Sequence, residues 1–208
     1  MQTIKKPAFA QQDIKKSNFL TYLVPYDEFD ETHEKLKLEH PKAVHIVWAY
    51  RHYNKYFQIV ENQSDDGEPH GTSGPPSLNA LRGADLINTG VFIVRYFGGI
   101  KLGTGGLVRA YSSSVNLAIN EAELIEYVIR DSFGFFVPFA LISRFEHFLE
   151  KEEIKVKTNF NAYGVDVLVD VTKDEFTKVY EFSHGFQIEG VKFLCFPLFA
   201  KETVQSFN

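Results

Sequence analysis

Hydrophobic and polar positions along the first 125 residues follow the periods of strands and helices. Alternating or near-continuous apolar runs predict four strands, at residues 17–24, 43–50, 56–60 and 90–97, with a turn at 51–54. The last run is apolar almost throughout, which is typical of a strand buried on both faces. Sparse apolar positions among charged residues predict a solvent-facing helix at 27–40, and a short helix is expected at 78–84.

A long amphipathic helix is predicted over residues 105–123. Thr104 precedes it and is the expected N-cap, because a threonine oxygen can accept a hydrogen bond from the first helical turn. The apolar side chains recur at helical spacing, and the expected buried stripe consists of Val108, Tyr111, Val115, Ala118, Ile119 and Ala122.

Beyond residue 125 the pattern changes and the glycine-rich segments stop. The second pattern predicts strands at 126–137, 154–160, 165–171 and 187–194, and helices at 138–151 and 173–184. The resulting order, βαββαβ, is that of a ferredoxin-like domain. We therefore expect an α+β protein of two domains, residues 1–124 and 125–208, with a less ordered tail at 197–208.

Composition narrows the class of protein. The 208 residues include one cysteine, Cys195, so an internal disulfide is excluded and a reducing compartment is expected. The apolar neighbours of Cys195 in the sequence predict that it lies in the core. No apolar run reaches membrane-spanning length, so we expect a cytoplasmic protein with no membrane contact. The net charge is −5, and residues 126–208 carry 9 Lys and Arg against 13 Asp and Glu. Without a basic excess, RNA binding would depend on a local patch.

The candidate chemistry is concentrated between residues 64 and 111. The glycine loop at 103–106 opens the predicted long helix, and Lys101 and Arg109 lie close to it in sequence. Free backbone N–H groups at a helix N-terminus bind anions, which makes this loop a candidate phosphate site. It matches neither the phosphate-loop motif nor the dinucleotide fingerprint, because it lacks the lysine and the third glycine that these need. The alternative is that the glycines serve only tight turns and close packing.

Arg95 ends the predicted buried strand and needs a carboxylate partner, because an unpaired buried guanidinium is costly. The acidic turn provides the nearest carboxylates, on Asp65, Asp66 and Glu68. Such a pair would either clamp the turn to the sheet or line a cleft that binds a ligand. The same acids with His70 suit a divalent ion, but the spacing matches no named site and we expect no metal. His45 is expected to be a hydrogen-bonded core or cleft residue.

Four stretches of the chain resemble the YigZ/IMPACT family, whose members are linked to translational control. They are KKSNFL near the start, HPKAVHIVWAYR at 40–51, SDDGEP-x-GT-x-G, and RYFGGIKLGTGGLVRAY. The resemblance covers essentially the whole chain and departs from the usual pattern at His70 and Pro75. It implies an N-terminal domain like the second domain of ribosomal protein five of the small subunit. It also implies a C-terminal domain like the last domain of elongation factor G.

The eukaryotic members relieve a starvation-sensing kinase by competing for its activator, so the resemblance implies a non-catalytic regulator. We expect it to bind RNA, the ribosome or a translation-associated protein through a cleft in residues 64–111, without a cofactor or a catalytic residue. The alternative is a metal-assisted enzyme acting on a phosphorylated small molecule or a nucleotide. The expected binding residues are Asp65, Asp66, Glu68, His70, Thr72, Arg95, Tyr96, Lys101, Thr104, Gly105, Gly106 and Arg109.

Overall fold

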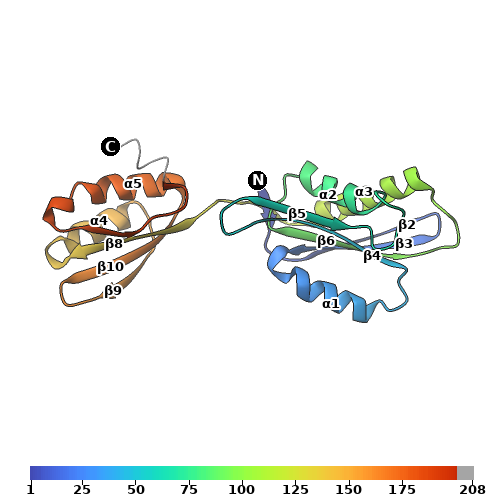
Figure 1. Cartoon of the computed structure of the whole chain (residues 1–208), viewed down its shortest axis with the longest axis horizontal. Helices are drawn as coiled ribbons and strands as arrows, with labels where there is room; N and C mark the ends of the chain where they lie inside the picture. Colours follow the sequence, from blue (N-terminus) through green and yellow to red (C-terminus); the bar gives the residue numbers. More distant parts are fainter. Residues whose placement is uncertain (201–208) are drawn as a thin grey trace. The chain divides into compact units, whose positions relative to one another are not determined.

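The computed structural model describes residues 1–200 and separates the chain into two compact units, Met1–Tyr127 and Val128–Asn208 (Figure 1). Both units combine helices with a sheet, as the sequence predicts. The expectation of a less ordered tail falls mostly on residues outside the described range. Within residues 1–200, no helix combines the length and the apolar character that crossing a membrane requires.

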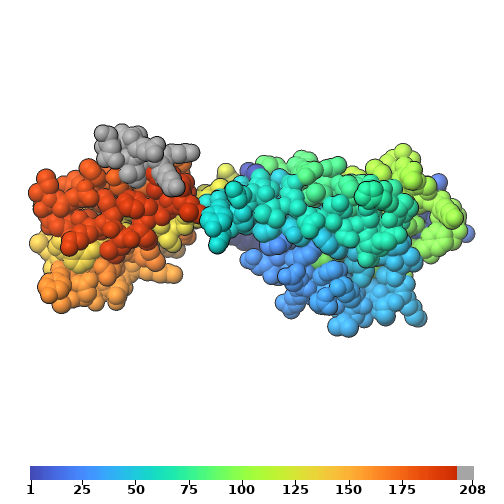
Figure 2. Space-filling view, viewed as in Figure 1, coloured from blue at the N-terminus to red at the C-terminus, as the bar shows by residue number. Residues whose placement is uncertain are grey.

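The first unit is built on a five-stranded antiparallel sheet with the order β2-β3-β6-β4-β5. Its strands are β2 (Ala8–Ile14), β3 (Ser17–Pro25), β4 (His45–Tyr53), β5 (Ile59–Ser64) and β6 (Thr89–Tyr96). Helices α2 (Gly74–Gly83) and α3 (Thr104–Glu121) cover one face, and α1 (Phe29–Glu39) covers the other (Figure 1). A small separate sheet pairs β1 (Gln2–Ile4) with β7 (Leu124–Glu126). In the space-filling view, α1 forms the blue surface on the lower side of this unit (Figure 2).

Strand β6 is buried over almost its whole length, as predicted, and its side chains point alternately to the two faces of the sheet. Val91 and Ile93 pack in the cluster under α2 and α3, whereas Phe92 and Val94 pack in the cluster under α1. Because side chains alternate along a strand, Arg95 lies on the α3 side of the sheet. Arg95 therefore lies on the same face of the sheet as the glycine loop and the acidic turn.

Two glycines let the chain pass from β6 into α3. A Cβ atom on Gly98 would lie 1.9 Å from the backbone oxygen of Lys16, so a larger residue cannot fit unless the β2–β3 turn moves. Gly103 has a φ of +74°, in the left-handed region that glycine adopts without steric cost. Gly103 is also the N-cap of α3, so the expectation that Thr104 caps this helix is wrong.

Three further expectations for the first unit are wrong. Strand β4 continues to Tyr53 through the predicted turn, because Arg51 is buried and pairs with Glu61 on β5. Strand β5 accordingly begins later than predicted. On α3, Val108 is 38% exposed, and its neighbour Leu107 lies in the core instead.

The second unit has the predicted element order βαββαβ. Its elements are β8 (Asp131–Pro138), α4 (Ile142–Lys151), β9 (Val156–Phe160), β10 (Gly164–Val171), α5 (Lys173–His184) and β11 (Lys192–Cys195). The strands pair antiparallel in the order β11-β8-β10-β9, and both helices pack in one hydrophobic cluster with the sheet. The likeness of the two units to domains of a ribosomal protein and of elongation factor G stays a prediction.

The predicted strand at 126–137 is two separate strands. Strand β7 ends at Glu126 and pairs with β1 inside the first unit, and β8 begins only at Asp131. The units consequently divide between Tyr127 and Val128, whereas the sequence placed the boundary after residue 124.

The end of the second unit also differs from the prediction. Residues 187–189 form a 3₁₀ turn, so the last strand, β11, is short. Strand β11 is an edge strand, and Cys195 at its end is exposed. The expectation that this cysteine belongs to the core is wrong, because apolar neighbours in sequence do not cover an edge position.

Candidate functional site

The predicted binding region forms a cleft of about 350 Å³ on the first unit. Its walls are the start of β4, the turn after β5, the end of β6 and the loop that leads into α3. Four predicted binding residues line it, namely Glu68, Arg95, Lys101 and Thr104. The fold thus brings the acidic turn and the glycine loop to one place.

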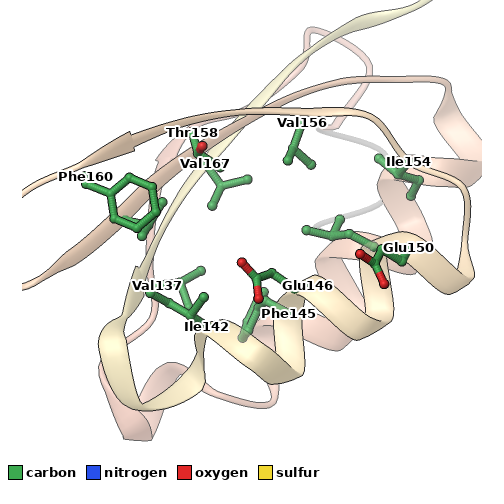
Figure 3. A pocket seen from close by; sticks show the side chains of 12 residues that line it. Val137, Ile142, Phe145, Glu146, Glu150, Ile154, Val156, Thr158, Phe160 and Val167 are labelled. Atoms are coloured by element: carbon green, nitrogen blue, oxygen red, sulfur yellow. The ribbon is translucent and has the colours of Figure 1, made fainter.

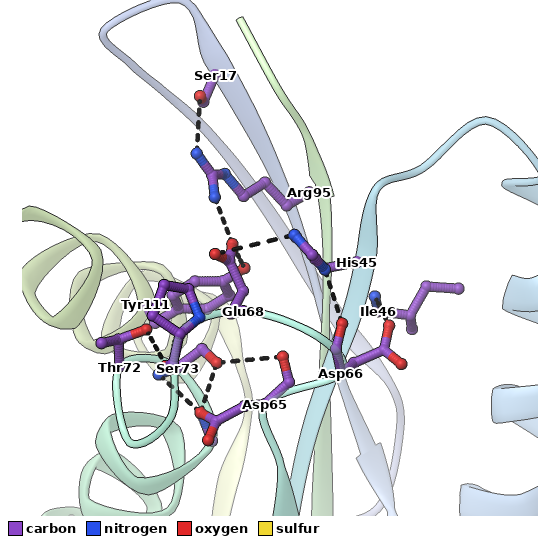
Figure 4. A network of polar contacts seen from close by, with 12 residues as sticks. Ser17, His45, Ile46, Asp65, Asp66, Glu68, Thr72, Ser73, Arg95 and Tyr111 are labelled. Carbon is purple, nitrogen blue, oxygen red and sulfur yellow. Dashed lines mark hydrogen bonds and ion pairs between the residues drawn. The ribbon is translucent and has the colours of Figure 1, made fainter. Parts of the chain in front are cut away.

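Glu68 and Arg95 form a buried ion pair beside the cleft (Figure 4). Their side chains are 3% and 6% exposed, and Arg95 Nη1 donates a hydrogen bond to Glu68 Oε1. The Tyr111 hydroxyl of α3 donates to the same oxygen at 2.7 Å. Arg95 Nη2 donates to Ser17 Oγ at 3.5 Å, while Arg95 Nε has no hydrogen-bond partner among the described residues. The pair joins the turn to the sheet, which is the clamp that the sequence suggested, with Glu68 as its acid.

Tyr111 completes this network from α3. Burial contributes most to raising the pKa of Tyr111, and the charge and hydrogen bond of Glu68 raise it further. The hydroxyl therefore keeps its proton and serves as a donor to Glu68. Sequence reasoning placed Tyr111 in the buried stripe but missed this role. The available signal was a tyrosine hydroxyl in an apolar stripe, which needs a partner when it is buried.

His45 closes the network on the β4 side. Because a carbonyl oxygen only accepts, His45 Nδ1 carries the hydrogen in its 2.6 Å bond to the Asp66 carbonyl. Nε2 lies 3.9 Å from Glu68 Oε2, and the side chain is 16% exposed. The expectation of a hydrogen-bonded cleft residue is confirmed.

Asp65 acts as a cap for α2 rather than as a cleft residue. Its carboxylate accepts backbone N–H bonds from Gly71 at 2.8 Å, from Ser73 at 3.0 Å and from Gly74 at 2.8 Å. It also accepts the Ser73 hydroxyl at 2.7 Å. Burial alone would raise the pKa of Asp65, but the hydrogen bonds from Gly71, Ser73 and Gly74 outweigh it and lower the pKa below its ordinary value.

We expect Asp65→Asn to lower the free energy of unfolding by about 1–3 kcal/mol near neutral pH, because an amide with one oxygen leaves backbone donors unsatisfied. The lowered pKa makes the contribution of Asp65 complete above its unfolded-state pKa of about 4 and lost as pH falls through the folded-state pKa. Urea unfolding of the wild-type protein and of Asp65→Asn should therefore give free energies of unfolding whose difference becomes smaller in acid. The exposed Asp30→Asn serves as the control and should change stability little. A difference in the free energy of unfolding that is as large in strong acid as at neutral pH would contradict the capping role of Asp65.

Asp66, Thr72 and His70 do not enter the cleft as ligands. Asp66 Oδ2 accepts the backbone N–H of Ile46 at 2.5 Å and so holds the turn to β4. Thr72 is 5% exposed, and its hydroxyl donates to a backbone carbonyl of the turn at 2.7 Å. His70 is fully exposed, with Nδ1 3.7 Å from an Asp65 oxygen.

Tyr96 lies on the opposite face of the sheet from the cleft. Its hydroxyl is 2.8 Å from His40 Nδ1, and its ring packs in the cluster under α1. Consecutive strand residues point to opposite faces, so placing Arg95 beside the cleft turns Tyr96 away from it. The structure does not bring this predicted residue to the site.

The mouth of the cleft is positively charged. The first turn of α3 leaves backbone N–H groups of Thr104, Gly105 and Gly106 without intrahelical partners, and it carries no acidic side chain. A Cβ atom on Gly105 would lie 3.8 Å from Arg109 Nη1, so the guanidinium lies over this turn. Lys101 lines the cleft and is exposed. Arg109 is exposed too but is not among the residues that line the cleft. Neither cation has an ion pair within residues 1–200.

Phe97 adds an aromatic surface that sequence reasoning did not select. It lines the cleft and is 48% exposed. Its ring centroid is 5.7 Å from the guanidinium carbon of Arg95, and the buried Phe19 ring lies 5.6 Å from the same atom. A partly exposed ring in a cationic cleft can stack on a nucleobase. The available signal was an aromatic residue placed directly after a buried strand.

The acidic turn does not gather into a metal site. Asp65 and Asp66 bind backbone N–H groups, and Glu68 is neutralised by Arg95. Among residues 1–200 no three His, Cys, Asp or Glu side chains converge in a way that could hold an ion. The metal-assisted alternative consequently lacks a ligand set at this turn.

Fold and site together define a two-unit α+β protein whose first unit has an anion-suited cleft fixed by a buried ion pair. Residues 15–119 match the Impact N-terminal domain family. The chain belongs to the IMPACT family.

Curated relatives agree with this assignment, and one solved structure is similar over nearly the whole chain. An IMPACT family member of Haemophilus influenzae is 37% identical over 172 residues, which cover 81% of this chain and 84% of the relative. The IMPACT family member YvyE of Bacillus subtilis is 32% identical over 176 residues, covering 83% of this chain and 80% of the relative. A crystal structure of a hypothetical protein covers 94% of this chain and 96% of its own, with a TM-score of 0.65 and 29% identity.

Proposed function

We propose that this chain is a non-catalytic, translation-associated regulator whose cleft binds the phosphate backbone of RNA, including ribosomal RNA. Membership of the IMPACT family supports the link to translation, because the resemblance implies regulators of that process. The chemistry of the cleft supports the choice of RNA.

The charge at the mouth of the cleft carries the proposal. Lys101 lines the cleft, the positive end of the α3 dipole opens on it at Thr104, and Arg109 lies over the first turn of that helix, which carries no neutralising acid. Like charges in one place repel, and an anion bound among them removes that cost. A phosphate accepts hydrogen bonds from helix N-terminal N–H groups and pairs with both cations.

The buried network supports the same conclusion. Glu68 is the carboxylate nearest to the cleft, but its charge is offset by Arg95, so it does not repel an anion at the mouth. Phe97 offers a ring for a base next to the phosphate position. The volume of about 350 Å³ is at the small end of ligand pockets and suits one nucleotide unit of a longer strand.

Fluorescence anisotropy with a labelled single-stranded RNA tests the proposal. Binding should weaken steeply between about 50 and 200 mM salt, because phosphate contacts release counterions. Affinity that is independent of salt, or no binding at the lower salt concentration, would contradict it.

A further inference from the structure

A second cavity lies wholly within the second unit, between α4 and β9, and has a volume of about 210 Å³ (Figure 3). Val156, Thr158 and Phe160 of β9 face α4 across it. Its floor is apolar and includes Phe145 and Leu149 of α4. We call this feature the α4–β9 groove.

Strand β9 leaves one backbone edge open along this groove. It is the last strand of the sheet and pairs only with β10, and all five of its residues are exposed. Asn161 N–H bonds the Gly164 carbonyl at the hairpin, and bonded and non-bonded pairs alternate along an antiparallel ladder. The backbone groups of Phe160, Thr158 and Val156 therefore face away from β10.

The same three residues thus present two recognition elements. Their side chains line the groove, and their backbone N–H and C=O groups face the open edge. An extended segment that pairs with this edge would direct every second side chain over the groove, since side chains alternate along a strand. Backbone pairing gives affinity in this mode, and the pockets for alternate side chains give specificity.

Charge indicates which segment fits. Glu146 and Glu150 of α4 line the groove, both are exposed, and neither has an ion pair within the described part of the chain. Figure 3 shows the Glu146 carboxylate pointing into the space in front of β9. An acidic wall above an apolar floor repels the phosphates of nucleic acid and attracts Lys and Arg.

We propose that the α4–β9 groove binds an extended, basic and apolar peptide segment of a partner protein, which adds a strand to β9. Apolar side chains of the peptide fill the groove, and its basic side chains pair with Glu146 and Glu150. The site does not depend on the cleft of the first unit.

A designed peptide tests this directly on the full chain. The probe is a labelled peptide about six residues long, the usual length of a strand, in which the alternate positions that face the groove carry valine or lysine and the other positions carry threonine. Its binding is followed by anisotropy and by amide chemical shifts, with the largest shifts expected in β9 and α4. Glu146→Lys with Glu150→Lys should weaken binding about tenfold or more. The same variant should improve binding of the peptide in which glutamate replaces lysine at the groove-facing positions.

Two controls separate recognition from general charge. Glu181→Lys puts the same type of charge change on an exposed position of α5 and should leave the affinity unchanged. A probe N-methylated at alternate residues loses its backbone donors and should bind poorly. The proposal would be overturned if the methylated probe bound as tightly as the unmodified one, or if the chemical-shift changes were confined to elements other than β9 and α4. It would also be overturned if Glu181→Lys reduced the affinity as much as the change at Glu146 and Glu150. A concentration-dependent dimer abolished by the Glu146 and Glu150 changes would overturn it as well, because the occupant would then be a second copy.

Discussion

Glu68→Ala is expected to lower the free energy of unfolding of the first unit by about 3–5 kcal/mol, because it leaves the Arg95 guanidinium buried without a counter-charge. The change also removes the acceptor of the Tyr111 hydroxyl, which is itself buried. A loss of this size is a large fraction of the roughly 5–15 kcal/mol that stabilises a typical domain. Urea unfolding followed by circular dichroism measures it.

A matched variant separates the ion pair from simple loss of packing. Glu68→Leu combined with Arg95→Met and Tyr111→Phe removes the ion pair and the tyrosine hydroxyl together, so no buried charge is left unpaired, and the Ser17 hydroxyl keeps its hydrogen bond from the Gly98 N–H. It should be clearly more stable than Glu68→Ala, since replacing a whole buried pair with apolar groups is often neutral. A triple variant as unstable as the single one, or a loss below about 1 kcal/mol for Glu68→Ala, would refute the clamp.

Lys101→Ala with Arg109→Ala is expected to weaken RNA binding on the order of tenfold. The salt slope should fall by roughly 1 for each phosphate that the variant no longer binds. Both side chains are exposed and without ion pairs in the described chain, so the fold should be unaffected. Anisotropy titrations at several salt concentrations give the affinity and the slope together.

The control for this variant removes the same number of charges elsewhere. Lys5→Ala with Lys6→Ala changes two exposed cations that lie outside the cleft. It should reduce affinity much less. Equal effects of the two double variants would indicate binding through overall charge and would contradict a cleft-based site. Arg95 is not a suitable position for this test, because its removal also breaks the buried pair.

The hydrophobic pattern predicted the elements that determine where the site lies. The apolar run of β6 was correctly assigned to a strand buried on both faces, and Arg95 at its end is buried as well. The need of a buried guanidinium for a carboxylate then predicted a clamp, and Glu68 provides it. The βαββαβ order of the second unit was equally readable, because its helices and strands have distinct periods.

What the sequence could not predict depends on contacts between distant residues. The polar segment at the end of β4 resembled a turn, yet it continues as a strand because Arg51 pairs with Glu61 and donates to the Leu86 carbonyl at 2.8 Å. Strand β2 was missed because its apolar residues are interrupted by a polar stretch, Gln11-Gln12-Asp13. Its Gln12 is held by α3 through Ser113 and Ser114.

Prediction of the candidate site from the sequence was limited for the same reason. Which acidic side chains of the turn face the cleft depends on the backbone conformation. The carboxylates of Asp65 and Asp66 accept hydrogen bonds from the backbone N–H groups of Gly71 and Ile46 instead. The α4–β9 groove has no sequence signature, because it arises from the register of β9 on β10.

A sucrose-gradient profile of the tagged protein in a cell extract tests the central claim most directly. The wild-type protein should migrate with ribosomal particles at low salt and leave them at high salt, and the Lys5→Ala/Lys6→Ala protein should behave in the same way. The Lys101→Ala/Arg109→Ala protein, shown to be folded by its unfolding curve, should remain at the top of the gradient. Migration of this variant with ribosomal particles, or absence of the wild-type protein from them at every salt concentration, would contradict the account.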